Sequence, residues 1–312
     1  MKKLIFFILL ILPTIVLALP TAKVTLLVKN ESGEPVSQAN AGVGFRIPKS
    51  EGWGSKSKGD KGLTDDEGLF TGEGETEQII LYGAKKSGYY SYHDKFTDLT
   101  GVSGITGFRR WQPWNPTLEV VLKKIKNPIA MYVYDTDRVK LPKFGEFIGY
   151  DLIKQDWLIP YGKGITADFL LKITKDVREK FDYTIDFELN FLSELDGIQS
   201  FDTKANGGSE LKSDHLAPSE GYNNNFKNRR ERTSGKVLIS PFIEGRNYYF
   251  RTRCDDDLES CLYGKVYGDI DFSSKSVRFI YYLNPTPGDR NVEFDPKKNL
   301  FKQRRGYEIK AP

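Results

Sequence analysis

Methionine, histidine and cysteine are scarce, since the 312 residues include only two of each. Two histidines cannot build a multi-histidine metal centre, and two methionines cannot form a Met-rich docking groove. The sequence also has no His-Glu-x-x-His, no Gly-x-Ser-x-Gly, no Gly-x-x-x-x-Gly-Lys phosphate loop and no Gly-x-Gly-x-x-Gly at the start of a helix. The enzyme classes that depend on these motifs lose their support, and we expect no cofactor and no metal.

The overall amino-acid composition is that of a folded chain. Apolar residues make up 39% and charged residues 28%, with 20 Phe, 17 Tyr and 4 Trp. Together with 29 Gly and 15 Pro, these values exclude a coiled coil, a collagen and a wholly disordered chain. At the usual ~100 to 200 residues per domain, the length allows two domains with buried cores.

The first eighteen residues have the three-part layout of an export signal. Two lysines precede an unbroken apolar run from Leu4 to Leu12, and small or modest side chains end the segment at Ala18. An uncleaved membrane anchor, the alternative, needs about 20 apolar residues, more than this run supplies. We therefore predict a signal peptide at 1–18 and an exported protein, periplasmic or secreted. No later segment is long and apolar enough to span a bilayer.

The charge balance gives little reason to expect a nucleic-acid partner. Removal of residues 1–18 takes away two lysines and no acids, which leaves 44 basic against 42 acidic residues, a net charge of +2. A nearly neutral chain exerts no strong long-range attraction on a polyanion. The basic run from Lys227 to Lys236 is a local exception that could hold an anionic polymer, with a solvated loop as the alternative.

Cys254 and Cys261 stand seven positions apart. In an oxidising compartment this pair predicts a disulfide rather than a metal site, because zinc pairs are spaced more closely and need two further ligands. The bridge would close a short loop and add about 2 to 3 kcal/mol to the stability of the fold. Four acidic residues crowd this loop but lack a calcium-binding register, which favours a solvated hairpin tip over a calcium site.

Short strands alternate with turns in the N-terminal third, a pattern typical of a small β-sandwich. Residues 23–29 are predicted to form a strand that ends in a turn containing Gly33 and Pro35. A tight acidic turn follows at 65–67, between two more short strands. Residues 50–62 are predicted to form a loop, and residues 96–116 an inserted loop.

The same third of the chain carries a family resemblance. Its motifs are Gly33-x-Pro35-Val36-x-x-Ala39, Thr64-Asp65-x-x-Gly68-x-Phe70 and Lys86-x-Gly88-Tyr89. They resemble the carboxypeptidase regulatory-like domain, a transthyretin-like or prealbumin-like sandwich of seven strands found in exported bacterial proteins. The resemblance implies a fold and no activity, since such modules serve as stabilising or adhesive accessories. We assign residues 19–125 to this domain.

Residues 126–312 are predicted to form a second all-β domain, a larger antiparallel β-sandwich or open barrel with little helix. Apolar and polar side chains alternate strictly from Phe181 to Phe191. Before this segment, Ala167, Phe169, Leu171 and Ile173 alternate with the polar residues Asp168, Lys172 and Thr174. We expect these two segments to pair antiparallel through a charged connection at 175–180, with a helix over 173–181 as the alternative.

Four more strands are expected in the second domain, at 236–243, 247–253, 262–272 and 277–283. Gly264 and Gly268 leave room beside the third of these strands for a bulky side chain. The segments at 126–132, 150–164 and 281–296 resemble uncharacterised bacterial and phage-associated proteins, a resemblance that implies no activity.

All four tryptophans stand near predicted loops or turns, where an indole ring can face solvent. Trp53 lies between two glycines, Trp111 and Trp114 flank a proline, and Trp157 precedes the turn that contains Tyr161. A sugar ring can stack on such a face while neighbouring polar side chains bond its hydroxyls. These five aromatic residues are the candidate ligand-binding residues. The alternative is that large rings close the ends of a sandwich or the seam between domains.

No catalytic residue is assigned. His93 and His215 each stand beside an aspartate, as in an oriented general base, but no nucleophile motif accompanies them. We predict that both histidines are surface turn residues. Asp182, Asp186 and Glu188 share one face of a predicted strand at about 7 Å spacing, and glycosidases need only two carboxylates. Acids that alternate along a solvent-facing strand are more often solubility features.

The sequence therefore favours an exported, non-enzymatic binding or structural protein of the cell envelope or surface. Its candidate partners are a polysaccharide or an envelope protein. A carboxylate-dependent glycan hydrolase is the first alternative, which two acids facing each other in a deep pocket would support. A component of a protein assembly is the second, which an unpaired strand edge or a large apolar patch would support.

Overall fold

The computed structural model describes residues 19–49, 53–104, 109–204, 207–236, 239, 241–301 and 309–312. The predicted signal peptide lies outside these residues. The chain divides into two units: the described residues of Met1–Lys85 with His93–Val120, and Lys86–Tyr92 with Val121–Pro312. The short segment Lys86–Tyr92 thus belongs with the second unit, which residue periodicity alone does not indicate.

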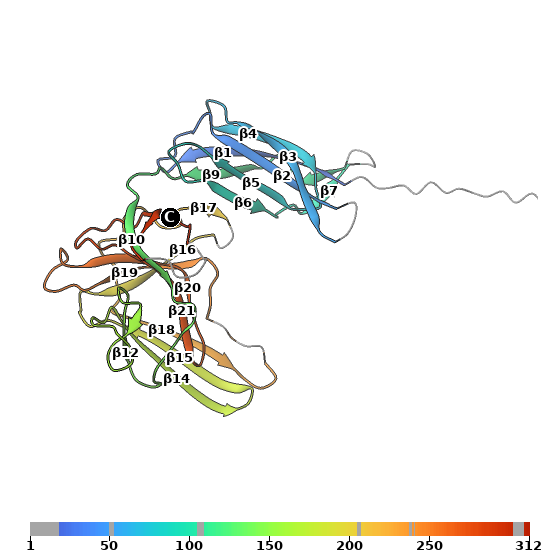
Figure 1. The fold of residues 1–312 in the computed structure, drawn as a ribbon. Helices are drawn as coiled ribbons and strands as arrows, with labels where there is room; N and C mark the ends of the chain where they lie inside the picture. The colour runs from blue at the N-terminus through green and yellow to red at the C-terminus, as the bar shows by residue number, and fades with distance from the viewer. Residues whose placement is uncertain are drawn as a thin grey trace, which may run out of the picture. The chain divides into compact units, whose positions relative to one another are not determined.

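The described residues form strands and no helix, which confirms the all-β prediction. No described segment could therefore cross a bilayer as a helix. The strands up to residue 122 are β1 (Thr21–Asn30), β2 (Asn40–Pro48), β3 (Ser55–Leu63), β4 (Leu69–Glu75), β5 (Ile80–Lys85), β6 (Tyr92–Phe96), β7 (Gly101–Ser103), β8 (Arg110–Gln112) and β9 (Thr117–Leu122). Figure 1 shows them in blue to green.

Two sheets form the first unit, in the orders β4-β1-β8-β7 and β6-β5-β2-β3, and β9 also pairs with β1. Alternate residues of β1 are buried, as the period-2 pattern predicts. The sheets approach closely where β4 carries glycine: a Cβ at Gly74 would lie 2.5 Å from Cδ2 of Phe45 in β2, so a larger residue there would separate the sheets.

Two predicted loops contribute strands to this unit. Residues 55–63 form β3, which pairs along its length with β2 although most of its side chains are exposed. The stretch predicted as an inserted loop at 96–116 contains β7 and β8, which pair with each other. A polar strand such as β3 and very short strands such as β7 and β8 carry no clear alternation of hydrophobicity, so the pattern could not reveal them.

The resemblance motif at 64–70 has a local structural purpose. Thr64 is buried, and its hydroxyl donates to the Val36 carbonyl at 2.7 Å and accepts the Ala39 amide at 2.9 Å. Oδ1 of Asp65 accepts the Leu69 amide at 2.7 Å, which closes the turn. Gly68 has φ of +74° in this turn, a backbone conformation that other residues rarely adopt.

The strands of the second unit are β10 (Ile129–Asp135), β11 (Val139–Lys140), β12 (Ile148–Asp151), β13 (Asp156–Trp157), β14 (Phe169–Glu179), β15 (Asp182–Asn190), β16 (Gly197–Asp202), β17 (Gly208–Ser209), β18 (Asn225–Arg232), β19 (Arg246–Thr252), β20 (Leu262–Phe272), β21 (Ser276–Leu283) and β22 (Phe294–Asn299). One sheet has the order β16-β19-β20-β21-β10-β22, with β11 beside β21. The other has the order β13-β12-β14-β15-β18.

The predicted antiparallel pair is confirmed, since Leu171 of β14 lies opposite Leu189 of β15. The charged residues 175–179 continue β14 instead of forming a connection, and the helical alternative at 173–181 is wrong. Three of the four further predicted strands are present as β19, β20 and β21. The fourth, at 236–243, is not: among its described residues only Ile239 makes an isolated bridge, to Glu231.

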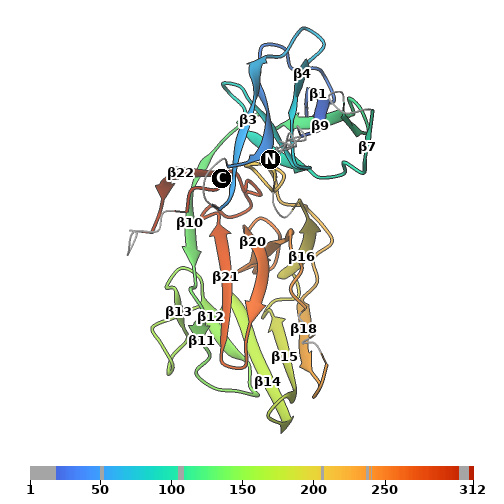
Figure 2. The same ribbon diagram turned by 90° about the vertical axis from the view of Figure 1, so that its right-hand side faces the viewer.

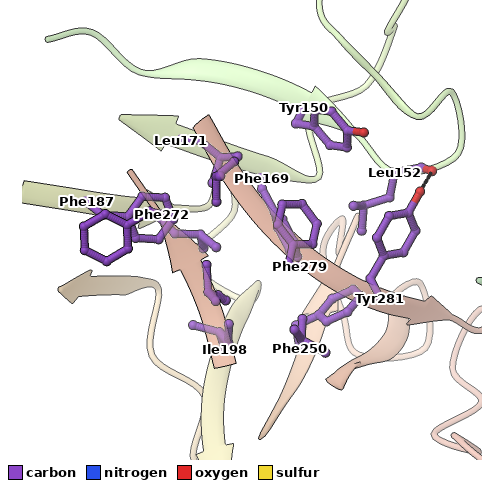
Figure 3. Packing of buried hydrophobic residues seen from close by; sticks show 14 of the residues in the cluster. Tyr150, Leu152, Phe169, Leu171, Phe187, Ile198, Phe250, Phe272, Phe279 and Tyr281 are labelled. Carbon is purple, nitrogen blue, oxygen red and sulfur yellow. Dashed lines mark hydrogen bonds between the residues drawn. The ribbon is translucent and has the colours of Figure 1, made fainter. Parts of the chain in front are cut away.

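Aromatic and aliphatic side chains from both sheets fill the core of the second unit (Figure 3). Phe187 of β15 stacks on Phe272 of β20 with ring centroids 5.1 Å apart, and the ring of Phe169 packs edge-on against Phe250 at 5.1 Å. A Cβ at Gly264 would collide with the Phe250 ring, so this glycine does make room for a bulky neighbour. Core packing of this kind fixes where the ends of β14, β15 and β18 project.

Candidate functional site

The β14–β15 hairpin extends beyond the turn between β20 and β21 (Figure 2). Residues of the hairpin, of β18 and of this turn line a pocket. On the inner face of β14, Phe169, Leu171 and Ile173 are fully buried in the core. The next inward positions of the same strand are Lys175 and Val177, which pass the end of the opposite sheet and line the pocket. The inner face thus changes from a core surface to a pocket wall along one strand.

The pocket has a volume of about 280 Å³. Its lining combines cationic, hydroxyl-bearing and apolar side chains: Lys175, Val177, Lys180, Tyr183, Ile185, Arg230, Ser273 and Ser274. None of these lining residues is a carboxylate. A wall with three cations and three hydroxyl groups suits a small polar ligand that carries negative charge.

Arg230 comes from β18, where it lies opposite Ile185 of β15. One terminal nitrogen of its guanidinium donates to Asp271 at 3.2 Å, and the group lies 5.4 Å from the centre of the Phe272 ring. Asp271 is shared with Arg138, whose terminal nitrogen lies 2.7 Å from its other carboxylate oxygen. One carboxylate therefore serves two guanidinium groups, and the pocket keeps an excess of positive charge.

The Nε atom of Arg230 is buried and has no hydrogen-bond acceptor among the described residues. The side chain itself is 19% exposed, so the buried nitrogen belongs to a residue at the pocket wall. A buried donor without an acceptor is costly, and most such donors in folded proteins are satisfied. Because this nitrogen has no accessible surface, a ligand in the pocket can contact only the other nitrogens of the Arg230 guanidinium.

Part of this site is visible in the sequence. The basic run at 227–236 stands out there, and its first six residues belong to β18 rather than to a solvated loop. Within that strand the residues alternate in direction, so Arg230 faces the pocket while Arg229 faces outward and pairs with Asp186 at 2.6 Å. The serines of the β20–β21 turn carry no signal in the sequence, because only the fold brings them to the hairpin.

The candidate aromatic residues of the first unit lie in different surroundings. Trp53 is fully exposed in the connection between β2 and β3. Trp111 is half-buried in β8, and its indole nitrogen donates to the Thr76 carbonyl at 2.9 Å. Trp114 is also half-buried, with the guanidinium of Arg110 4.6 Å from its ring centre. Only Trp53 offers both faces of its ring to solvent.

Trp157 and Tyr161 belong to the second unit. Trp157 is 5% exposed and packs edge-on against Tyr150 at 5.1 Å, so it is a core residue and does not present its ring to solvent. Tyr161 is 43% exposed in the loop after β13. The structure therefore leaves Tyr161 as the accessible one of these two rings, and neither lines the basic pocket.

The predicted disulfide is confirmed between Cys254 and Cys261. Both cysteines are buried in a small core with Tyr249 and Tyr263, while the acidic residues between them are exposed. The amide of Cys254 donates to Oδ1 of Asp196 at 2.9 Å, and burial raises the pKa of this aspartate to about 6. The described residues contain no group of three or more His, Cys, Asp or Glu side chains placed to hold a metal ion.

The carboxylates on the outer face of β15 are each engaged by a basic side chain. Asp182 lies 2.5 Å from Arg178, Asp186 lies 2.6 Å from Arg229, and Glu188 lies 2.8 Å from Lys172. The hydrogen bond from Lys172 lowers the pKa of Glu188. Carboxylates that are paired with basic side chains on an open sheet face are poorly placed to donate a proton to a glycosidic oxygen.

The prediction that both histidines lie in surface turns is wrong for His215, which is 8% exposed. Its Nδ1 lies 3.1 Å from Glu293, which also accepts the Tyr90 hydroxyl at 2.8 Å and the Asn127 amide at 2.9 Å. Burial raises the pKa of Glu293, but these backbone and side-chain hydrogen bonds outweigh it and hold the pKa below its ordinary value. The polar groups of this buried network are hydrogen-bonded to one another, which is typical of a network that stabilises the fold.

The buried amine of Lys265 could act as a catalytic base toward Ser213, but a substrate has no access to this pair. The amine of Lys265 lies 3.0 Å from the Ser213 hydroxyl, and burial together with the charge of Lys123 lowers its pKa to about 7. Such a pair can activate a serine. Ser213 is only 2% exposed and does not line the basic pocket, so a substrate cannot reach it. The sequence gives no sign of either residue's role.

The fold and the site together define an all-β chain of two sheet units with a basic, hydroxyl-lined pocket in the second. No protein-family model and no curated protein matches the sequence. Among solved structures, the shaft pilin SpaA from Lactobacillus rhamnosus GG aligns over 87% of this chain and 95% of its own, with 11% identity and a TM-score of 0.24.

A protein of Bacteroides uniformis ATCC 8492, for which carbohydrate binding is proposed, aligns over 84% of this chain and 98% of its own. The identity is 10% and the TM-score 0.19. Likeness at these values establishes neither a shared fold nor a shared function. The resemblance of the N-terminal third to the carboxypeptidase regulatory-like domain stays a prediction.

Proposed function

We propose that this chain is an exported, non-enzymatic binding protein of the cell envelope or surface, and that its ligand is a polysaccharide. The observation that carries the proposal is the pocket at the end of the β14–β15 hairpin. Its volume of about 280 Å³ is near the lower end of small-molecule sites, so it fits a short segment of a chain rather than a large cofactor.

The chemistry of the pocket wall favours a sugar. Hydroxyl groups of Tyr183, Ser273 and Ser274 can exchange hydrogen bonds with sugar hydroxyls, while the exposed side chain of Val177 offers apolar surface to the C–H face of a ring. Trp53 and Tyr161, whose rings are exposed, are proposed as additional stacking surfaces elsewhere on the chain. The buried disulfide supports export, since such bonds persist in oxidising compartments.

The hydrolase alternative receives less support. Asp182, Asp186 and Glu188 are paired with basic side chains on the outer face of β15, whereas the pocket lies on the inner face. A glycosidase needs two carboxyl groups that both reach the scissile bond. No carboxyl group belongs to the pocket lining, so the pocket lacks the groups that would cleave a glycosidic bond in a bound polysaccharide.

The assembly alternative rests on unpaired strand edges. β3 stands at the end of its sheet order, but it carries Lys56, Lys58 and Lys61. Lysines on an edge strand oppose pairing with another chain. We infer that the first unit instead acts as a stabilising accessory of the transthyretin-like type, as its turn motifs suggest.

The test is retention of the purified chain on a panel of insoluble and soluble polysaccharides, with a parallel assay for reducing-sugar release. We expect retention on at least one polysaccharide and no release of reducing ends. Release that disappears in Glu188→Gln would favour the hydrolase instead. No retention on any member of the panel would refute the proposed function.

A further inference from the structure

We infer that the pocket at the end of the β14–β15 hairpin binds an acidic polysaccharide through one anionic group, with Arg230 as the directional donor. This inference rests on the proposed function and adds the charge of the ligand. It commits to an acidic glycan because the pocket wall contains three cations, several hydroxyls and no carboxylate.

The first support is the position of the three cations. Lys175 and Arg230 occupy inward-facing positions of β14 and β18, and both are close to Ile185 in the register of the sheet, which pairs with each of them. Lys180 adds a third cation from the turn after β14. Two basic side chains that flank one buried residue bring their charges into the same space, which favours an anion between them.

The second support is the fixed direction of the Arg230 guanidinium. The hydrogen bond to Asp271 and the Phe272 ring hold this group in place, and the Arg230 side chain stays 19% exposed. The guanidinium can therefore donate in a fixed direction to an oxygen of a carboxylate, sulfate or phosphodiester group. The lysine ammonium groups would add charge without a fixed direction, since they rotate freely on flexible stems.

The carboxylate of Asp271, which could compete with a ligand anion for Arg230, already pairs with a second arginine. Asp271 is the acid that contacts Arg230, and it also accepts from Arg138 at 2.7 Å. It therefore cannot neutralise all the cations around the pocket, and the excess charge remains for a ligand. A nucleic acid is a weaker candidate, because the whole chain is close to neutral and the pocket wall offers a single aromatic ring, Tyr183, for base stacking.

The test compares variants of two neighbouring residues on β18. Arg230→Gln removes the inward cation, whereas Arg229→Gln removes the same charge from the outer face, so the pair separates the pocket from the net charge. The probes are polygalacturonate, dextran sulfate, a phosphodiester-linked teichoic acid and neutral dextran, measured by affinity electrophoresis or calorimetry at fixed salt. The first three distinguish carboxylate, sulfate and phosphate as the anion.

We expect the full-length chain to bind at least one acidic polysaccharide at least tenfold more tightly than neutral dextran. Arg230→Gln should weaken that binding at least tenfold, and Arg229→Gln should change it less than twofold. Arg230→Lys, which keeps the charge and removes the planar guanidinium, should recover only part of the affinity. Should Arg230→Gln fail to fold, the exposed Lys175→Gln takes its place, with an expected loss of at least threefold.

Equal losses in the Arg230 and Arg229 variants would overturn the inference, as would equal binding of neutral and acidic glycans. If the chain binds neutral dextran and neither substitution changes that affinity, the proposed polysaccharide binding would be supported, and the inference that the ligand is acidic would be refuted. Stabilisation by inorganic sulfate that Arg230→Gln abolishes, without retention on any glycan, would support the anion site and refute polysaccharide binding. Tighter binding of single-stranded DNA than of any glycan would overturn the choice of ligand.

Discussion

The guanidinium of Arg253 bonds both carboxylate oxygens of Asp168, with Nε 2.7 Å from Oδ1 and a terminal nitrogen 2.8 Å from Oδ2. Asp168 immediately precedes β14, and Arg253 immediately follows β19, so the pair ties together the two sheets of the second unit. Burial lowers the pKa of Arg253, but the hydrogen bonds and charge of Asp168 outweigh it and raise the pKa above its ordinary value. The same guanidinium reaches Asp151 at 3.1 Å.

The first prediction concerns this pair. Asp168→Asn should lower the free energy of unfolding by about 3 to 5 kcal/mol, because an amide nitrogen would replace one acceptor and face a donor. Oδ2 accepts the Leu152 amide at 2.7 Å and Oδ1 accepts from Arg253, so either orientation of the amide meets an N–H group. Urea unfolding followed by tryptophan fluorescence measures the change.

Asp186→Asn is the matched control, because Asp186 also pairs with an arginine but on the open face of β15. Its unfolding midpoint should stay near that of the parent chain, since exposed ion pairs contribute little. An equal shift in the two variants would contradict the argument that burial makes the Asp168 pair important.

The second prediction concerns pH and Lys265. Its folded-state pKa of about 7 lies below the ordinary value of 10.5, so between these values the unfolded chain binds more protons than the folded chain. The free energy of unfolding should therefore rise with pH from about 7 toward 10, with a slope that approaches ~1.4 kcal/mol per pH unit. Below pH 7 this lysine is charged in both states, and its unfavourable contribution is complete.

Lys265→Met should raise the stability at pH 7 and flatten this slope, because it removes a buried charge that has lost its solvation. Urea unfolding at pH 7, 8 and 9 measures both effects, below the range in which tyrosines ionise in the unfolded chain. Lys297→Met, at an exposed position of the same unit, should leave the slope as it is. A parent chain whose stability does not change over this range would show that the amine is not desolvated.

The third prediction concerns the disulfide. Replacing Cys254 and Cys261 together by serine should lower the free energy of unfolding by about 2 to 3 kcal/mol, because the open loop gains entropy in the unfolded chain. Burial of two serine hydroxyls in the core beside Tyr249 and Tyr263 would add to the loss. Urea unfolding compares the double variant with the parent chain, and a thiol assay under denaturing conditions confirms that the parent is oxidised.

How far the sequence predicts this molecule depends on where the hydrophobic alternation persists. β14, β15 and β21 bury alternate residues over part of their length, so their period-2 pattern is clear. β19 and β20 bury runs of consecutive residues, and their apolar content between turns predicts them instead. β3 buries no residue fully, and its polar sequence resembles a loop. The disulfide is predictable because only two cysteines exist and the expected compartment is oxidising.

The candidate site is only partly predictable. Arg230 stands out as part of a basic run, but its direction depends on the register of β18 against β15, which the sequence does not state. Ser273 lies 43 positions further along the chain, and only tertiary folding brings it to the pocket. The sequence misplaces His215 for the same reason, because its partner Glu293 is distant in sequence and makes its burial favourable.

The fourth prediction separates two tryptophans that the sequence treats alike. Trp157→Ala should lower the free energy of unfolding by about 3 to 5 kcal/mol, since it leaves a cavity beside Tyr150 in the core. Trp53→Ala should leave the stability unchanged, because its fully exposed ring gains nothing from folding. Urea unfolding measures both, and acrylamide should quench Trp53 far more than Trp157.

The exposed ring also allows a test of the proposed stacking surface. If Trp53 contacts a sugar, Trp53→Ala should reduce retention on the polysaccharide that the chain binds, while Trp53→Phe should keep part of it, because a smaller ring still stacks. Retention that is equal in the parent, Ala and Phe chains would remove Trp53 from the binding surface. That result would leave the pocket around Arg230 and the exposed ring of Tyr161 to account for binding, because neither includes a residue of the loop that carries Trp53.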